Sequence, residues 1–170
     1  ATLRRQRQMC IRDRCNNFSM LDHDADGDQE LVLSLGSPYR GFAILDLDSQ
    51  GRLVIIKKIR PDEMLVGSGL LYSAVVDYDN DGYEDLLAIS PEGNTIKAQP
   101  FYNIGGIFDS GPLIRKNFEG ISGILHNSFQ LTDWDADGFK DVLAPFRSGD
   151  IIALTLTPAT LVIERVPVQP

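Results

Sequence analysis

Carboxylate side chains recur in one nine-residue pattern at three places in this chain. Each copy has aspartate at positions one, three and five, glycine at position six, and aspartate or glutamate at position nine, over residues 22–30, 77–85 and 133–141. Three carboxylates at alternate positions of a tight loop converge on one point. Hard oxygen ligands on such a loop suit Ca²⁺ better than Mg²⁺, which demands octahedral geometry. The spacing predicts three calcium-binding loops, here named loop 1, loop 2 and loop 3.

Each loop is expected to supply four carboxylates, from positions one, three, five and nine, and one backbone carbonyl, from position seven. The residue type at position seven varies freely, as a backbone ligand allows. The glycine at position six stands where the chain must turn sharply and a Cβ would obstruct it. The expected ligand residues are Asp22, Asp24, Asp26, Asp28 and Glu30 in loop 1, Asp77, Asp79, Asp81, Tyr83 and Asp85 in loop 2, and Asp133, Asp135, Asp137, Phe139 and Asp141 in loop 3.

The sequence argues against two other calcium-binding motifs and leaves one alternative interpretation of the pattern open. An EF-hand needs a bidentate glutamate at position twelve, which is occupied here by Leu33, Ala88 and Ala144. Short apolar runs of strand length follow each loop, where an EF-hand has an amphipathic helix. The glycine-dense nonapeptide of calcium β-rolls is also absent. Aspartate-rich turns, in which side chains merely cap the backbone, stay open as an alternative.

The spacing of the loops points to a repeated all-β fold. Four apolar runs recur in the same order within each period of about 55 residues, and the loop joins the first run to the second. Four antiparallel strands per repeat is typical of a β-propeller blade. The expected runs are 18–21, 30–35, 41–47 and 53–59 in the first repeat, 72–76, 85–90, 95–102 and 107–114 in the second, and 128–132, 141–146, 151–156 and 161–166 in the third.

The predicted organisation is therefore blade 1 over residues 15–66, blade 2 over 67–122 and blade 3 over 123–170. Propellers normally close with four to eight blades. We accordingly expect the chain to be part of a larger propeller, whose remaining blades would cover its two end sheets. A short open array of calcium-braced sheets is the alternative architecture.

Residues 1–14 do not share the pattern of the rest. They hold five arginines and one aspartate and show no strand periodicity. The run Met-Cys-Ile-Arg-Asp at 9–13 reads as the translation of a transposon end used in sequencing-library adapters. We expect this segment to be a translated assembly artefact and leave it out of the fold. A basic disordered tail and the start of a signal peptide are the alternatives, although no apolar segment follows.

Bulk composition limits the classes of function. The formal net charge is −8 with two cysteines in 170 residues, so neither a basic surface for nucleic acid nor a disulfide framework is indicated. No run of residues reaches the length of an apolar membrane span. Calcium would take the place of disulfides as a cross-link, which suits an extracellular, cell-surface or periplasmic protein, where millimolar calcium fills even weak loops.

The loops and the strands after them resemble FG-GAP/VCBS repeats, the blades of integrin-α-type β-propellers. Residues 77–88 and 133–144 match most closely, and 101–108 resemble the Asn-x-Gly-Gly-x-Phe turn of VCBS-type blades. The resemblance covers residues 16–166. It implies one Ca²⁺ per loop, held by the ligands named above, that rigidifies its blade. Glu30 in place of aspartate and the absence of a full Phe-Gly-Gly-Ala-Pro string depart from the family pattern.

Three functions are compatible with these features. The first is a binding module for an unknown protein or carbohydrate ligand, acting in adhesion or recognition without chemistry of its own. The second is part of a secreted enzyme such as a polysaccharide lyase or phospholipase, with its catalytic residues elsewhere. The third is a calcium-dependent spacer. Among the loop aromatics, Tyr78 and Trp134 could stack on sugars or pack between blades.

Overall fold

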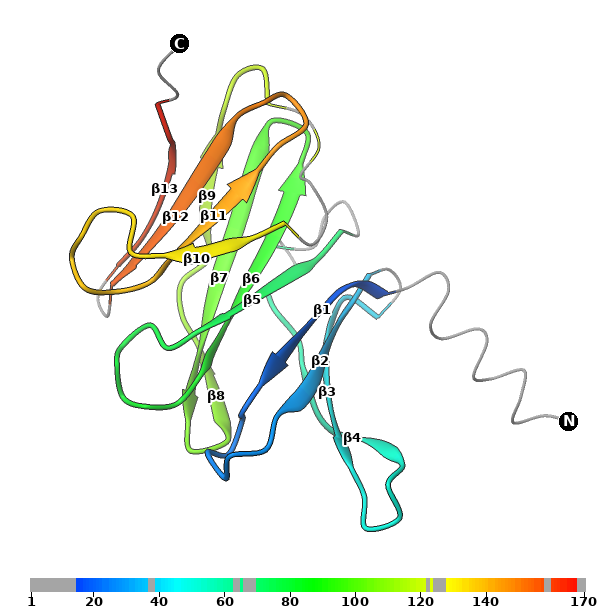
Figure 1. Cartoon of the computed structure of the whole chain (residues 1–170). Helices are drawn as coiled ribbons and strands as arrows, with labels where there is room; N and C mark the ends of the chain where they lie inside the picture. Colours follow the sequence, from blue (N-terminus) through cyan, green and yellow to red (C-terminus); the bar gives the residue numbers. More distant parts are fainter. Residues whose placement is uncertain are drawn as a thin grey trace, which may run out of the picture.

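All regular structure described in this computed structural model is β-strand (Figure 1). The structure describes residues 15–36, 39–62, 65, 70–121, 123, 128–157 and 160–167. The expected adapter-derived segment, 1–14, lies outside them. Within the described residues no stretch forms a helix that could cross a lipid bilayer. The expected all-β class is confirmed.

The strands form three antiparallel sheets, and each draws its residues from one of the three expected repeats. In each sheet the chain passes from one strand to its neighbour, which is a meander, except that β9 returns to pair with β7. Sheet 1 has the order β1 (Cys15–Leu21), β2 (Glu30–Leu35), β3 (Gly41–Leu47) and β4 (Leu53–Ile59). Sheet 2 has the order β5 (Tyr72–Val76), β6 (Asp85–Glu92), β7 (Thr95–Ile104) and β8 (Ile107–Ser110), and β9 (Ile114–Asn117) also pairs with β7. Sheet 3 has the order β10 (Gln130–Thr132), β11 (Asp141–Pro145), β12 (Ile151–Thr157) and β13 (Thr160–Arg165).

Sheet 2 differs from the expected four strands because its outer strand is broken in two. Both β8 and β9 pair with the long strand β7, and residues 111–113 pass opposite Pro100 between them. Pro100 has no N–H to offer a neighbouring strand. Its carbonyl accepts the Gly111 N–H at 2.9 Å, and a Cβ on Gly111 would lie 2.7 Å from the Pro100 ring. The single expected run at 107–114 is therefore two short strands.

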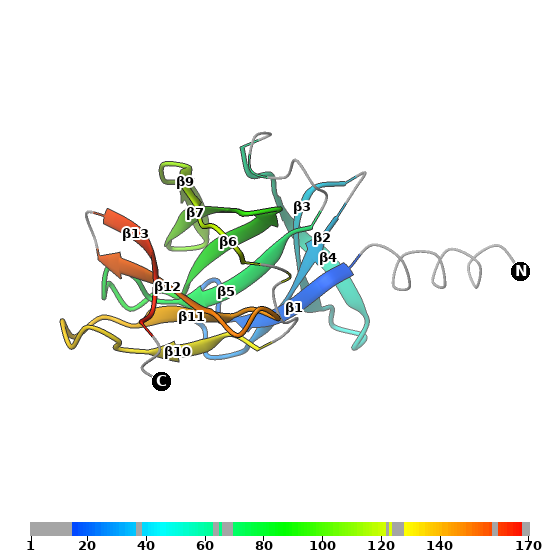
Figure 2. The ribbon, with the colours of Figure 1, turned by 90° about the horizontal axis from the view of Figure 1, so that it is seen from above.

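Sheet 2 lies between the other two sheets, as Figure 2 shows from above. The side chains of β6 alternate between two apolar cores. Leu86 and Ala88 pack toward sheet 1, whereas Leu87 and Ile89 pack toward sheet 3. No sheet closes on itself within the described residues. The three sheets thus stack face to face in chain order.

A buried polar cluster fastens the first strands of sheets 1 and 2. Asn17 is only 5% exposed. Its Oδ1 accepts the Ser73 N–H at 3.0 Å and its Nδ2 donates to the Ser73 carbonyl at 3.1 Å, so the amide imitates a strand neighbour of Ser73. The Ser34 hydroxyl donates to the same Oδ1 at 2.5 Å.

Replacing Asn17 with alanine should destabilise the protein by ~2–4 kcal/mol, because the Ser73 backbone groups and the Ser34 hydroxyl lose partners in a buried position. Chemical denaturation of the two proteins measures the difference. Ser19→Ala is the matched control, since it removes only the hydroxyl that meets the Ser73 hydroxyl at 2.9 Å. A loss no larger in Asn17→Ala than in Ser19→Ala contradicts the anchoring role.

Candidate metal centres

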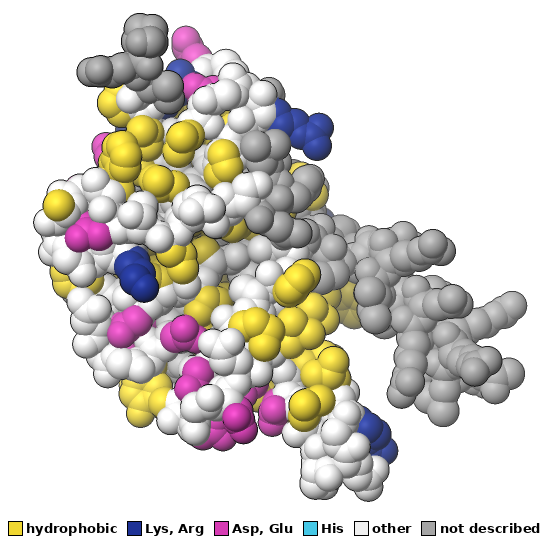
Figure 3. Space-filling model, in the orientation of Figure 1, with side chains coloured by type: hydrophobic (Ala, Val, Ile, Leu, Met, Phe, Trp, Pro, Cys, Tyr) yellow, Lys and Arg dark blue, Asp and Glu magenta, His cyan; other side chains and the backbone are white. Residues whose placement is uncertain are grey.

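The three loops join the first and second strands of the three sheets, and they lie along the left and lower-left edge of Figure 1. Figure 3 shows acidic side chains gathered at the lower end of the same face. The backbones of the three loops follow the same path, and the residues at positions four and six have positive φ angles. The φ angles are 60°, 56° and 62° at Ala25, Asn80 and Ala136, and 95°, 94° and 94° at Gly27, Gly82 and Gly138.

The glycine at position six is required for its backbone angle and not for space. A Cβ added at Gly27, Gly82 or Gly138 would meet nothing within 4 Å. The expectation that a Cβ would obstruct the turn is wrong in this respect. Because a φ near +94° is strained for any residue with a Cβ, glycine is still the residue that fits.

Carboxylates at positions one and five fold each loop around itself in the same way. The aspartate at position one accepts the position-six N–H at 3.1 Å in all three loops. The aspartate at position five accepts the position-seven N–H at 2.9, 2.8 and 2.9 Å in loops 1, 2 and 3. These bonds pre-shape the loops, and an aspartate-rich turn without an ion would make them too.

Position nine is the buried acid of each loop. Glu30, Asp85 and Asp141 are 5%, 1% and 0% exposed, and each accepts the position-two N–H at 2.8 Å. The second oxygen of Asp85 accepts the Asn103 N–H at 2.6 Å, and that of Asp141 accepts the Leu156 N–H at 3.3 Å. Both aspartates therefore join the loop to the third strand of the sheet through neutral donors.

Candidate ligand atoms converge in every loop. Carboxylate oxygens within 4.8 Å of one another come from positions one, three and nine in loops 2 and 3, and from positions one, three and five in loop 1. A second group in loop 1 joins His23, Asp24 and Glu30, with 3.4 Å from His23 Nδ1 to Glu30 Oε2.

The remaining expected ligands lie in the loops but outside these groups. In loops 2 and 3 these are the position-five acids, Asp81 and Asp137, whose oxygens hold the position-seven N–H. A role for the carbonyls of Asp28, Tyr83 and Phe139 stays a prediction.

The donor set fits a hard cation. It consists of closely spaced carboxylate oxygens, and among the described residues Asp22 Oδ1 is buried without a hydrogen-bond donor. Crowded carboxylates repel one another and lose hydration, and an ion among them removes both costs. Oxygen ligands on a flexible loop are of the kind that Ca²⁺ accepts, and the identity of the ion stays a prediction.

Burial raises the pKa of three loop acids, Asp79, Asp85 and Asp141, in the absence of an ion. Desolvation raises the pKa of Asp85 to about 6, although the Asn103 and Tyr78 N–H groups act in the opposite direction. Desolvation likewise raises the pKa of Asp141. At Asp79 desolvation is again the largest cause, followed by the charge of Asp81.

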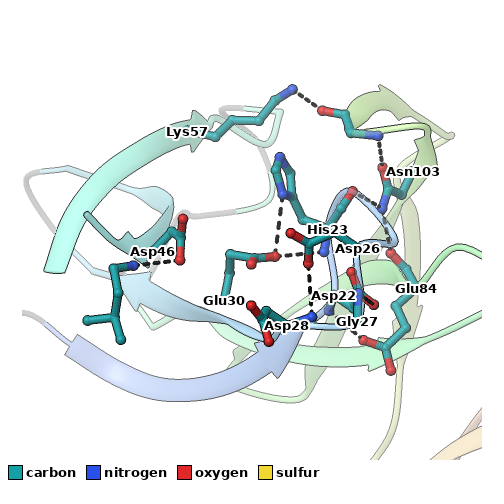
Figure 4. Close-up of polar contacts among 12 residues, drawn as sticks. Asp22, His23, Asp26, Gly27, Asp28, Glu30, Asp46, Lys57, Glu84 and Asn103 are labelled. Carbon is teal, nitrogen blue, oxygen red and sulfur yellow. Dashed lines mark hydrogen bonds and ion pairs between the residues drawn. The ribbon is translucent and has the colours of Figure 1, made fainter. Parts of the chain in front are cut away.

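Two residues outside the expected ligand set also shape this region. Glu84, at position eight of loop 2, accepts the Asp22 N–H at 2.8 Å, and Asn103 Nδ2 donates to the His23 carbonyl at 2.9 Å (Figure 4). The sequence gives no local signal for the Glu84 contact, since the partners are 62 residues apart. Asn103 belongs to the Asn-x-Gly-Gly-x-Phe turn, but its reach to loop 1 is a property of the packed sheets.

Of the two loop aromatics singled out in the sequence, one is buried and one is exposed. Tyr78 is 1% exposed and belongs to the core between sheets 2 and 3. Trp134 is 42% exposed. Tyr78 thus packs between sheets, and only Trp134 presents a face to solvent.

No family model, curated protein or solved structure matches this chain significantly.

The metal-free protein should become more stable as the pH falls from 7 toward 5. The pKa of Asp85 is about 6 in the folded protein and near 3.9 in the unfolded chain, so the folded protein binds the proton at the higher pH. The free-energy cost of burying the Asp85 charge is therefore relieved as the pH falls through about 6. Asp79 and Asp141 add to the same trend. Denaturation of metal-free protein at pH 5, 6 and 7 measures it.

Asp85→Asn is the control for this pH dependence, because it keeps the shape of the side chain and removes the titrating proton. Its stability should change less between pH 7 and pH 5 than that of the unaltered protein. A free energy of unfolding that stays level or falls over this range in the unaltered protein contradicts the buried-acid account.

Proposed function

We propose that this chain is a calcium-binding module of FG-GAP/VCBS type. In this proposal its three sheets are blades of a larger β-propeller, and Ca²⁺ is structural. The module serves adhesion or recognition of a protein or carbohydrate ligand at the surface of, or outside, the cell. The observation that carries the proposal is the repetition, in three sheets, of the same loop hydrogen bonds, from position six to position one and from position two to position nine.

Electrostatics supports an ion in these loops. The buried position-nine acids of loops 2 and 3, Asp85 and Asp141, receive only neutral N–H donors in the bonds described above, which leave their charges uncancelled. Other carboxylates of the same loop stand within 4.8 Å. A divalent cation at that point would compensate several charges at once and would hold the two strands flanking the loop.

The stacking of the sheets supports the propeller. Each sheet is a meander of neighbouring strands, and sheet 2 buries both of its faces against the sheets beside it. In a propeller every blade is covered in this way, and further blades would do the same for sheets 1 and 3. Several large apolar side chains of sheet 1 are exposed, among them Phe18, Leu53 and Ile55.

An ion with a structural role leaves the remaining surface for recognition. Blades braced at their loops hold neighbouring surface loops in fixed positions, and binding residues are commonly placed on loops that a rigid scaffold positions. The negative net charge and the carboxylate-rich end of the molecule point away from nucleic acid.

Calcium should raise the melting temperature by ~5–10 °C per occupied loop over that in EDTA, because an ion that binds only the folded state adds about 2.7 kcal/mol per site at a hundred times its Kd. Scanning calorimetry in EDTA and in millimolar Ca²⁺ measures the shift, and titration calorimetry should count three ions. Identical melting curves in the two buffers contradict the proposal.

Removing the loop 2 ion gives a sharper version of this test. Asp77→Asn with Asp79→Asn should lower the count from three ions to two, because both are candidate ligands while the buried Asp85 is retained. Asp109→Asn, in an exposed position on β8, is the matched control and should leave three. Trp134, the single tryptophan, reports loop 3 by its fluorescence and should respond to calcium in both proteins.

A further inference from the structure

Loop 1 is held by residues of sheet 2 as well as by its own sheet. Glu84 Oε2 accepts the Asp22 N–H at 2.8 Å, so position eight of loop 2 fixes position one of loop 1. Figure 4 shows the Glu84 side chain reaching loop 1 from the neighbouring strand connection. Glu84 directly precedes Asp85, the buried acid of its own loop. A change in the backbone of loop 2 at this point therefore moves the acceptor on which loop 1 rests.

Asn103 joins the same two loops from the end of β7. It is 1% exposed, and its Nδ2 donates to the His23 carbonyl at 2.9 Å and to the Glu84 carbonyl at 3.1 Å. Its backbone N–H donates to Asp85 at 2.6 Å. One buried residue thus bonds position two of loop 1 and positions eight and nine of loop 2.

The tip of the β7–β8 hairpin keeps Asn103 in place. Asn103 Oδ1 accepts the Gly106 N–H at 2.9 Å, and the Gly106 carbonyl accepts a bond of 2.6 Å from Lys57 Nζ on β4. A Cβ on Gly106 would lie 3.6 Å from His23 Nε2, so the hairpin rests directly against loop 1. The connection that Asn103 makes between loops 1 and 2 is therefore supported by β4 of sheet 1 and by the β7–β8 hairpin of sheet 2.

Loop 3 does not share this connection in the part of the chain that the structure describes. Position eight is Lys140, which is exposed, and the third-strand residue that donates its N–H to the buried Asp141 is Leu156, whose side chain offers no hydrogen bond. The hydrogen bonds described for loop 3 are all made within sheet 3.

We propose that Glu84 and Asn103 couple calcium binding by loop 1 to calcium binding by loop 2, while loop 3 binds independently. The proposal rests on the calcium-binding function proposed above. An ion in loop 2 orders Asp85 and therefore Glu84. The Glu84 carboxylate then stands ready to accept the Asp22 N–H, and the Glu84 carbonyl holds the Asn103 amide that donates to His23. Loop 1 has less conformational freedom left to lose when its own ion binds, so each ion raises the affinity of the other by the same factor.

Glycine amide signals in ¹⁵N–¹H NMR follow each loop separately, because Gly27, Gly82 and Gly138 each donate to the first aspartate of their own loop. Calcium is titrated into the full chain and into the Asp77→Asn, Asp79→Asn variant. Loss of the loop 2 ion should weaken calcium binding at Gly27 by about 5-fold or more, the lower range for coupled sites. The midpoint at Gly138 should not change.

Glu84→Ala and Asn103→Ala, each made with and without the loop 2 substitutions, test the route. In the presence of either alanine substitution, the loop 2 substitutions should no longer shift the calcium concentration at the midpoint of the Gly27 titration. Glu84→Gln keeps an acceptor oxygen and should preserve the coupling. Lys140→Ala, at position eight of loop 3, is the matched control and should leave the coupling between loops 1 and 2 intact.

The outcomes separate the coupling from the calcium-binding function. If no glycine signal responds to calcium, the proposed function fails. If the signals respond but the Gly27 midpoint ignores the loop 2 substitutions, or the Gly138 midpoint shifts equally, the coupling is refuted. Coupling that persists in Glu84→Ala and Asn103→Ala, or that disappears in Glu84→Gln, overturns the hydrogen-bonded route. Because Glu84 is only partly buried, its variant tests the route even if Asn103→Ala does not fold.

Discussion

A buried carboxylate at the start of the second strand is the constraint on which each sheet depends. Glu30, Asp85 and Asp141 occupy this place, and each is at most 5% exposed. The carboxylate orders the loop through the position-two N–H, yet its charge is costly to hold away from water. The hydrogen bond to the position-two N–H therefore stabilises the folded loop, whereas the buried charge destabilises it. A cation among the other loop acids would reconcile them, and for this reason the proposed function and the fold share one set of residues.

The two interfaces of the middle sheet are built differently. Between sheets 1 and 2, buried polar side chains such as Asn17 and Asn103 add many directional bonds to the apolar core. Between sheets 2 and 3 the core of described residues is larger, and one bond at its exposed margin runs from Arg165 to the Glu119 carbonyl. A buried polar network whose hydrogen bonds are all made favours one relative position of the two sheets, whereas apolar contacts are less directional. Sheets 1 and 2 are thus joined by buried directional bonds as well as by apolar contacts.

Local patterns predicted much of this fold. The runs at 30–35, 41–47, 53–59 and 72–76 coincide with β2, β3, β4 and β5 because alternating apolar residues and turn signals lie within a few positions of one another. The break between β8 and β9 was missed because it depends on Pro100, in the strand alongside. The nine-residue pattern likewise located the loop carboxylates. It could not reveal Glu84 or Asn103, whose partners are 62 and 80 residues away and meet them only after the sheets pack.

The broken outer edge of sheet 2 has a consequence for solubility. An unbroken edge strand offers a row of free backbone groups onto which a strand of another molecule can add, the first step of many aggregates. Here β8 and β9 are four residues each, a Gly-Pro step separates them, and β9 carries Arg115 and Lys116. An incoming strand would find two short, offset segments and positive charge on one of them. Pro100, the proline of β7 that lies opposite the break, thereby helps to protect the sheet from uncontrolled growth.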